Sequence, residues 1–179
     1  MRLLNSVFIV FFLSFFLVSC TSSSLPDAFS SYPLKMTDLK TALFYEYSNS
    51  SETLTIKERS FSSDESAIEF MDEQAVLFYS IFEPQRVSYP GPTTKNIICP
   101  DEFKPVKTVI EQPVRLIFYR GFANANQVWG ACSNDSIAYK SVRAFLYCQK
   151  TKSLYTINYF VQPEQDALID SFVEGLNCE

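Results

Sequence analysis

An apolar run near the N-terminus limits how much of this chain can contribute to a folded core. Residues 7–18 are Phe, Leu, Ile and Val, interrupted only by Ser14, and Arg2 carries the one charge that precedes them. At about 12 residues the run is too short to cross a hydrocarbon core of about 30 Å, for which a helix needs about 20 residues. A short apolar stretch behind a positive charge is typical of a secretory signal, which is removed and does not belong to the fold.

The residues that follow this run point to a class of exported protein. Leu17, Val18, Ser19 and Cys20 resemble the lipobox of bacterial lipoproteins. The resemblance implies that Cys20 receives a diacylglycerol, that the chain is cut before it, and that the new amine gains a further acyl chain such as palmitate. Several acyl chains, at about 0.8 kcal/mol per buried methylene, would make the membrane attachment permanent. The alternative is an ordinary secretory signal, with Cys20 as a further disulfide cysteine.

The segment after Cys20 suggests a location and a tether. By resemblance to sorting in Gram-negative envelopes, Thr21 after the cysteine, rather than Asp, implies the outer membrane, with the domain facing the periplasm or the cell surface. Residues 20–33 are rich in Ser and contain two prolines, a composition typical of a flexible connection. We therefore expect a cleaved signal peptide over residues 1–19, a lipidated tether over residues 20–33, and one globular domain over residues 34–179.

Four cysteines remain for the domain if Cys20 carries lipid, namely Cys99, Cys132, Cys148 and Cys178. They are far apart in a chain without histidine, so zinc-type spacing is absent. In an oxidising compartment four cysteines permit three disulfide pairings. A strand over residues 153–161 with a helix folded back over it would bring Cys178 beside Cys148. The predicted disulfides are therefore Cys148–Cys178 and, by elimination, Cys99–Cys132.

The predicted elements define an α+β domain. Residues 41–47 and 52–60 flank a polar turn and indicate a hairpin, although the first could be a helix. Ser62 and Glu65 match a capping box, and no Gly or Pro interrupts the residues from there to Phe82, which predicts a helix. Its apolar end, residues 75–82, could equally be a buried strand. Six prolines between residues 83 and 113 predict little regular structure there.

The second half of the domain is predicted to be mainly strands. Strands are expected over residues 114–120, 127–132, 137–148 and 153–161, and an amphipathic helix over residues 164–176. In the last strand Thr156 and Asn158 mark the more solvated face. The complete expectation is an antiparallel sheet of about five to six strands, with an internal helix and a C-terminal amphipathic helix packed on it.

The chain lacks the residues that many catalytic sites require. Without histidine, Ser-His and Cys-His nucleophiles and the common histidine metal sites are excluded, and four glycines provide no phosphate-binding loop. A formal net charge of −5 gives no reason to bind nucleic acid. A group of carboxylates on the predicted internal helix is interpreted as a solvated face: Asp64, Glu65, Glu69, Asp72 and Glu73. We expect no cofactor, no metal and no enzymatic activity.

Aromatic residues are the most unusual part of the composition, with 17 Phe and 10 Tyr. Most are expected in the core, but aromatic and arginine side chains together are also enriched at protein interfaces. The candidate interface residues are Phe118, Tyr119, Arg120, Phe122, Trp129, Tyr139 and Arg143. The leading hypothesis is an anchored, non-enzymatic interaction or assembly module that binds another envelope protein. The alternatives are a carrier of a small apolar ligand and a histidine-free hydrolase of envelope polymers.

Overall fold

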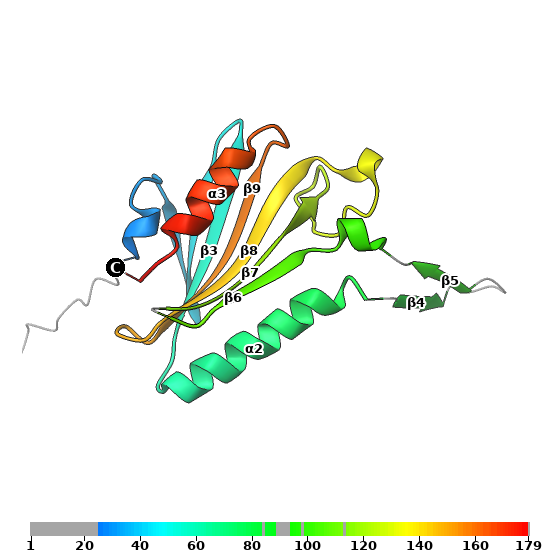
Figure 1. Ribbon diagram of the computed structural model, residues 1–179. Helices are drawn as coiled ribbons and strands as arrows, with labels where there is room; N and C mark the ends of the chain where they lie inside the picture. Colours follow the sequence, from blue (N-terminus) through cyan, green and yellow to red (C-terminus); the bar gives the residue numbers. More distant parts are fainter. Residues whose placement is uncertain (1–24, 84, 89–93, 98, 113, 179) are drawn as a thin grey trace, which may run out of the picture.

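A seven-stranded antiparallel sheet forms the centre of the protein, in the order β1-β2-β3-β9-β8-β7-β6. The computed structural model describes residues 25–83, 85–88, 94–97, 99–112 and 114–178, so the expected signal peptide and Cys20 lie outside the described residues. Helices α2 (Asp64–Ser80) and α3 (Asp166–Gly175) lie on opposite faces of the sheet (Figure 1). The strands are β1 (Lys35–Leu39), β2 (Ala42–Ser48), β3 (Glu52–Ser60), β6 (Val106–Ile110), β7 (Arg115–Ala123), β8 (Tyr139–Cys148) and β9 (Ser153–Val161). The α+β expectation is confirmed, with more strands than the five to six expected.

The predicted hairpin of the N-terminal half is present as β2 and β3. Its turn is held by Asn49, whose side-chain oxygen accepts hydrogen bonds from the amides of Ser51 and Glu52, each at 2.8 Å. An Asn side chain that accepts from the next backbone amides is a common turn former. The edge strand β1 was not expected from the sequence, and its five residues are all exposed, so no apolar alternation marks it.

Strand β9 lies in the middle of the sheet, between β3 and β8, although it is the last strand in the chain. Tyr155, Ile157 and Tyr159 are buried on the side of α3. Thr156 and Asn158 point to the opposite side and are half-buried, as their polarity predicts. The pairing of β9 with both neighbours joins the two halves of the sheet.

Helix α2 settles the ambiguity over residues 75–82, because the chain is helical as far as Ser80. Its N-cap is Ser63 rather than the expected Ser62, and the Ser63 hydroxyl accepts a hydrogen bond from the Ser66 amide at 3.2 Å. The buried stripe of the helix faces the sheet, at Ala67, Met71, Ala75 and Phe78.

Helix α3 and the segment from Leu25 cover the other face. The 3-10 helix η1 (Asp27–Phe29) places Phe29 in the core with 1% of its surface exposed. Leu25, Ala28, Phe29 and Tyr32 therefore pack with the folded domain, so the expectation that the whole of residues 20–33 is a tether is wrong from Leu25 onward. The sequence feature that indicated this packing was Phe29, an aromatic residue within a Ser-rich segment.

The proline-rich region contains more structure than expected. Strands β4 (Gln85–Ser88) and β5 (Thr94–Ile97) form a separate two-stranded sheet, and the 3-10 helix η2 (Asp101–Phe103) precedes β6 at the edge of the main sheet. The expected strand over residues 127–132 is wrong. Only an isolated bridge joins Ala123 and Trp129, because Gln127 and Gly130 have φ angles of 57° and 99°, which interrupt extended structure.

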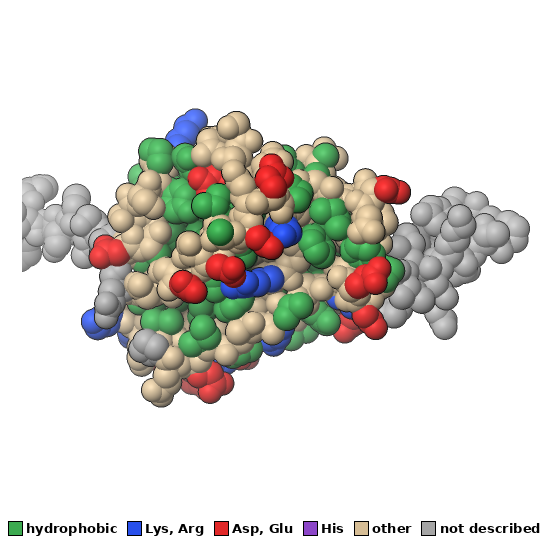
Figure 2. Space-filling view, turned by 45° about the horizontal axis from the view of Figure 1, so that its top comes forward, with side chains coloured by type: hydrophobic (Ala, Val, Ile, Leu, Met, Phe, Trp, Pro, Cys, Tyr) green, Lys and Arg blue, Asp and Glu red, His purple; other side chains and the backbone are tan. Residues whose placement is uncertain are grey.

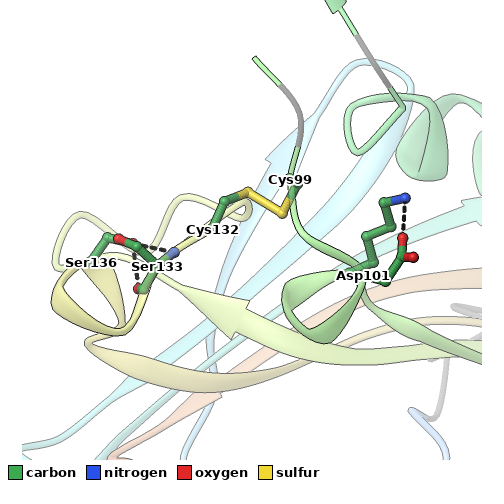
Figure 3. The surroundings of a disulfide bond; sticks show 6 residues. Cys99, Asp101, Cys132, Ser133 and Ser136 are labelled. Atoms are coloured by element: carbon green, nitrogen blue, oxygen red, sulfur yellow. Dashed lines mark hydrogen bonds and ion pairs between the residues drawn. A yellow bond between two sulfur atoms is a disulfide. The ribbon is translucent and has the colours of Figure 1, made fainter. Parts of the chain in front are cut away.

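The four cysteines of the domain form Cys99–Cys132 and Cys148–Cys178, the pairs that the sequence analysis expects. Cys178 follows α3 and returns to the end of β8, with 5.4 Å between the Cα atoms. Cys99 joins the end of the proline-rich region to the loop before the 3-10 helix η3 (Asn134–Ser136) (Figure 3). The first disulfide therefore links two irregular segments to each other, and the second links the segment after α3 to the sheet.

Candidate interaction surface

Helix α2 covers only part of its face of the sheet, over β7, β8 and the start of β9, and leaves a polar row beside it. The strand register aligns Arg143 on β8 with Asn158 on β9, and Asn158 with Thr55 on β3. Arg143 Nη1 donates to Asn158 Oδ1 at 2.6 Å, and Asn158 Nδ2 donates to Thr55 Oγ1 at 3.1 Å. All three side chains are half-buried, so the row is accessible to solvent between apolar neighbours.

The charge of Arg143 has no counter-charge in the part of the chain that the structure describes. Its guanidinium lies 5.5 Å from the ring centre of Phe78 and 5.3 Å from that of Phe145. Burial lowers the pKa of Arg143, and its Nε is buried without a hydrogen-bond partner. The hydrogen bond to Asn158 and the ring faces stabilise the cation only in part, because neither carries a negative charge.

Two further cations of β3 share this face with Arg143. Side chains alternate along a strand, so Lys57 and Arg59 point to the same side as Thr55. The Arg59 guanidinium lies 4.5 Å from the ring centre of Phe70 on α2, which fixes the side to which they point. We call Lys57, Arg59 and Arg143 the cationic strip. It lies on a protein whose formal net charge is −5.

Helix α2 adds apolar side chains along one border of the cationic strip. Leu77 lies seven residues after Phe70, and Ile81, at the C-cap, lies four residues after Leu77, so both continue the side of the helix on which Phe70 lies. Leu77 is 60% exposed and Ile81 is 46% exposed. Glu46 of β2 lies opposite Thr55 in the strand register and adds one acidic side chain to this face. A mainly basic floor with an apolar border is the composition expected of a surface that docks an acidic, partly apolar segment.

The seven candidate interface residues do not form one surface. Phe118 and Tyr119 are buried, with 5% and 1% of their surfaces exposed, and belong to the core. Tyr119 packs beneath α2, where its hydroxyl donates to the Ala75 carbonyl at 3.0 Å. Arg120 points to the opposite face and pairs with Asp170 of α3. Figure 2 shows this α3 face, where acidic and basic side chains lie side by side.

The remaining candidates, Trp129, Tyr139 and Phe122, lie around the N-terminal end of β8. Trp129 packs against Phe78 at 4.9 Å between ring centres, and against Phe160 at 6.3 Å. Tyr139 also contacts Phe160, at 6.4 Å. Phe122 packs on Phe103 of η2 instead. Arg143, Trp129 and Tyr139 therefore lie on the α2 side of the sheet, together with the buried Tyr119.

Sequence reasoning missed a buried carboxylate on the α3 side. Glu58 of β3 is 3% exposed and accepts hydrogen bonds from Tyr45 and Ser153, each at 3.0 Å, and from Tyr155 at 3.4 Å. Burial, together with the Glu58 charge, raises the pKa of Tyr155 to about 12. The available signal was a Glu within a strand whose alternate residues, Leu54 and Ile56, are apolar.

Four of the α2 carboxylates, Glu65, Glu69, Asp72 and Glu73, line a shallow, open hollow along the helix, and none of the four is buried. Asp64 accepts from Tyr147 at 2.7 Å and Gln149 at 2.6 Å, and these hydrogen bonds lower the pKa of Asp64. Asp72 pairs with Arg115 at 2.9 Å. Glu65, Glu69 and Glu73 are exposed along the outer side of the helix. Among the residues described, no group of acidic or cysteine side chains is arranged to hold a metal ion.

The larger hollows of the surface are not enclosed apolar chambers. A hollow of about 630 Å³ lies where α2 begins and is lined by charged side chains, among them Asp64, Glu111, Arg115 and Lys150. Another, of about 350 Å³, lies on the α3 side and contains Glu52. A third, of about 1110 Å³, lies along α2 and is open to solvent. None of the three is the enclosed apolar chamber expected of a carrier for an apolar ligand.

Comparison with known proteins adds no assignment to this geometry. No model of a protein family, no curated protein and no solved structure matches the chain. Within the described ranges, no helix is long and apolar enough to span a bilayer.

Proposed function

We propose that this chain is a membrane-anchored envelope lipoprotein whose domain acts as a non-enzymatic protein-interaction module. The docking surface is the cationic strip beside α2, and the observation that supports it most directly is Arg143. Its guanidinium is half-buried, has a buried Nε without a hydrogen bond, and forms no ion pair with any described residue. A partner carboxylate would supply the counter-charge in a setting where charge-assisted hydrogen bonds are strong.

The partner is expected to present an acidic segment with apolar residues at its margin. Lys57 and Arg59 extend the positive charge beyond Arg143, and Leu77 and Ile81 offer exposed apolar surface along the border. Complementary charge mainly selects the partner and speeds association, whereas the apolar border contributes buried area. Interfaces with a charged centre and an apolar border commonly divide the two roles in this way, and the charges also fix how the partners align.

The anchor is part of the same proposal. Lipid on Cys20 would leave four residues between the lipidated cysteine and the folded domain at Leu25, and the five steps from Cys20 to Leu25 reach about 17 Å when extended. The domain would thus work close to a bilayer, at the outer membrane facing the periplasm or the cell surface. Another envelope protein is the expected partner.

Site-specific photocrosslinking in the native host tests the docking surface. Benzoylphenylalanine at Thr156, which lies between Lys57 and Phe145 in the sheet, is expected to give one discrete product that contains an envelope protein. The Arg143→Gln variant should lower the yield at least fivefold, and mass spectrometry should place the crosslink in an acidic segment.

Two matched controls make this experiment decisive. The same photocrosslinker at Lys107, an exposed cation on the edge strand β6, should give no such product. Arg115→Gln removes an arginine of the same helix-facing side that already pairs with Asp72, and should leave the yield unchanged. Equal products from positions 156 and 107, or a yield indifferent to Arg143→Gln, would refute the proposed surface.

A further inference from the structure

The outer surface of α2 has the charge that the cationic strip lacks. Glu65, Glu69 and Glu73 are exposed and follow one another at intervals of four residues, so they form one row along the helix. We call these three residues the acidic row. Val76 and Leu77 lie beside it, and they are 67% and 60% exposed. All five side chains line the shallow hollow along α2, which is therefore an acidic and partly apolar surface.

The acidic row and the cationic strip have no ion-pair partners within the described part of the chain. The ion pairs found there use other side chains, such as Asp72 with Arg115. The row and the strip lie on the same side of the sheet, but they cannot meet in one molecule. The buried stripe of α2, which includes Met71 and Ala75, faces the sheet, so the acidic row points away from it. Contact between the two charged surfaces needs a second molecule.

The two charged surfaces have similar lengths. From Glu65 to Glu73 the acidic row extends about 12 Å, at about 1.5 Å per helical residue. Arg143 is aligned with Thr55 across β9, so the cationic strip runs along β3 from the level of Thr55 to Arg59. That distance is about 13 Å, at about 3.3 Å per strand residue. A helix laid along β3 would bring the whole row over the whole strip.

The α2 side of strands β1, β2 and β3 has room for one further helix. Helix α2 of the same molecule lies over β7, β8 and the start of β9. Three neighbouring strands are about 10–14 Å wide, and a helix with its side chains is about 10–12 Å across. Phe44 is half-buried on this floor, and the acidic Glu46 lies opposite Lys35 in the strand register. The floor is therefore net positive and partly apolar.

We propose that two copies of this chain form a two-fold dimer, in which α2 of each copy lies on the uncovered strands of the other. The acidic row of each α2 contacts the cationic strip of the other copy, and the Leu77 side chains approach each other near the axis. This dimer rests on the docking surface proposed above, which expects an acidic, partly apolar segment, and it names α2 of a second copy as that segment.

The two-fold arrangement uses every part of the surface twice. In such an interface the same patch of each subunit faces its own copy, so both contacts between row and strip form together. Each half-buried Arg143 gains carboxylates nearby, in a setting where charge-assisted hydrogen bonds are strong. The two helices would fill one layer between the two sheets, and each α3 would remain on the outside.

Paired charge reversals in the full-length protein test the dimer. Two differently tagged copies are expressed together in the native host and extracted in a maltoside detergent at about 0.15 M salt, where long-range repulsion between acidic molecules is largely screened. The second tag is then measured in the pull-down of the first. Wild-type copies should co-purify. The strip variant Lys57→Glu/Arg59→Glu and the row variant Glu69→Lys/Glu73→Lys should each co-purify with themselves at least tenfold less.

The mixed pair of these two variants gives the sharpest result. In that pair each reversed surface meets an opposite charge on the other copy, so the yield should return to within about twofold of the wild type. The control Lys107→Glu/Lys150→Glu changes the net charge as much as the strip variant does, at exposed positions outside the strip, and should co-purify like the wild type. Wild-type copies that do not co-purify, or a mixed pair no better than the self-pairs, would overturn the dimer.

Smaller reversals keep the test valid if a double variant does not fold. Lys57→Glu and Glu73→Lys each change one exposed side chain. Each should weaken its self-pair at least threefold, and the two together should recover most of the loss. Equal yields from all three pairs would overturn the dimer.

The photocrosslink at position 156 separates failure of the dimer from failure of the docking surface. A product with twice the mass of the chain, crosslinked within residues 64–80, would support the dimer. A product with a different protein, together with wild-type copies that do not co-purify, would overturn the dimer and leave the docking surface in place. The absence of any product at position 156 would overturn both.

Discussion

Tyr147 on β8 donates a hydrogen bond from its hydroxyl to Asp64, the first residue of α2, at 2.7 Å. The two residues are 83 positions apart in sequence, and the contact holds the start of the helix to the middle of the sheet. Burial and this hydrogen bond raise the pKa of Tyr147 to about 12. The same hydrogen bond, followed by that from Gln149, lowers the pKa of Asp64.

These shifts predict how stability depends on pH. For Tyr147 the stabilisation is complete below its unfolded pKa of about 10 and is lost as the pH rises through about 12. For Asp64 it is present above the unfolded pKa and is lost as the pH falls through the lowered folded value. Thermal midpoints of the wild type should therefore fall between pH 10 and 12, and Tyr147→Phe should reduce this fall. Identical alkaline slopes in both proteins would contradict the prediction.

Gly121 of β7 is predicted to tolerate no side chain. A Cβ there would lie 3.1 Å from the Trp129 ring and 3.2 Å from Pro105 Cβ. Gly121→Ala should lower the unfolding free energy by about 1–3 kcal/mol, as overpacking does, measured by urea denaturation. Gly175→Ala is the control, because a Cβ at that helix position meets nothing within 4 Å. A Gly121→Ala protein as stable as the control would show that Trp129 can move aside.

The Cys148–Cys178 disulfide closes the domain by joining β8 to the segment after α3, across a sequence separation of 30 residues. Replacing both cysteines by alanine should reduce the unfolding free energy by about 2–4 kcal/mol, because the unfolded chain regains freedom. Chemical denaturation with and without reductant measures it. In the double variant, reductant should change the unfolding free energy only through the remaining Cys99–Cys132 bond. A loss of unfolding free energy below about 1 kcal/mol in the double variant would disprove a structural role for Cys148–Cys178.

Arg143 is predicted not to stabilise the isolated domain, and to destabilise it if anything changes. Its charge is half-buried without a counter-charge among the described residues, so Arg143→Met should leave the unfolding free energy unchanged or raise it by up to about 2 kcal/mol. Arg115→Met breaks the partly exposed pair with Asp72 and should lower it by up to about 1 kcal/mol. A large loss at Arg143 would indicate that the arginine serves the fold rather than a partner.

Intact-mass analysis of the protein from membranes tests the anchor. The expected species begins at Cys20, carries added lipid mass, and exposes four alkylatable thiols only after reduction. Cys20→Ala should abolish the lipid mass and release the domain from the membrane fraction. A lipid-free mature chain, or thiols that react without reduction, would exclude the proposed compartment.

The sequence was most informative where a pattern is local and long. The alternation in β9 and the unbroken stripe of α2 appear directly in the order of residues, and both elements were predicted close to their observed bounds. The Cys148–Cys178 pair also followed, since a helix folded back on its own strand fixes where it ends. Strands β1 and β6 were not predicted, because both lie at the exposed edges of the sheet and neither shows an alternation of buried apolar residues.

The candidate surfaces were harder to predict, because each is assembled from strands that are distant in sequence. Arg143 was identified for its residue type, but its neighbours Asn158 and Thr55 depend on strand register. Phe118 and Tyr119 were wrongly predicted to be interface residues, because the sequence of an aromatic strand is the same whether its side chains are exposed or covered by a helix.

The place of β9 between β3 and β8 has a consequence for how this protein folds. The strands before α2 and the strands β6, β7 and β8 share no strand pairing except through β9. Each half of the sheet therefore has an open edge, at β3 and at β8, until β9 inserts between them. An open strand edge can pair with another chain, so slow insertion of β9 would favour aggregation over folding.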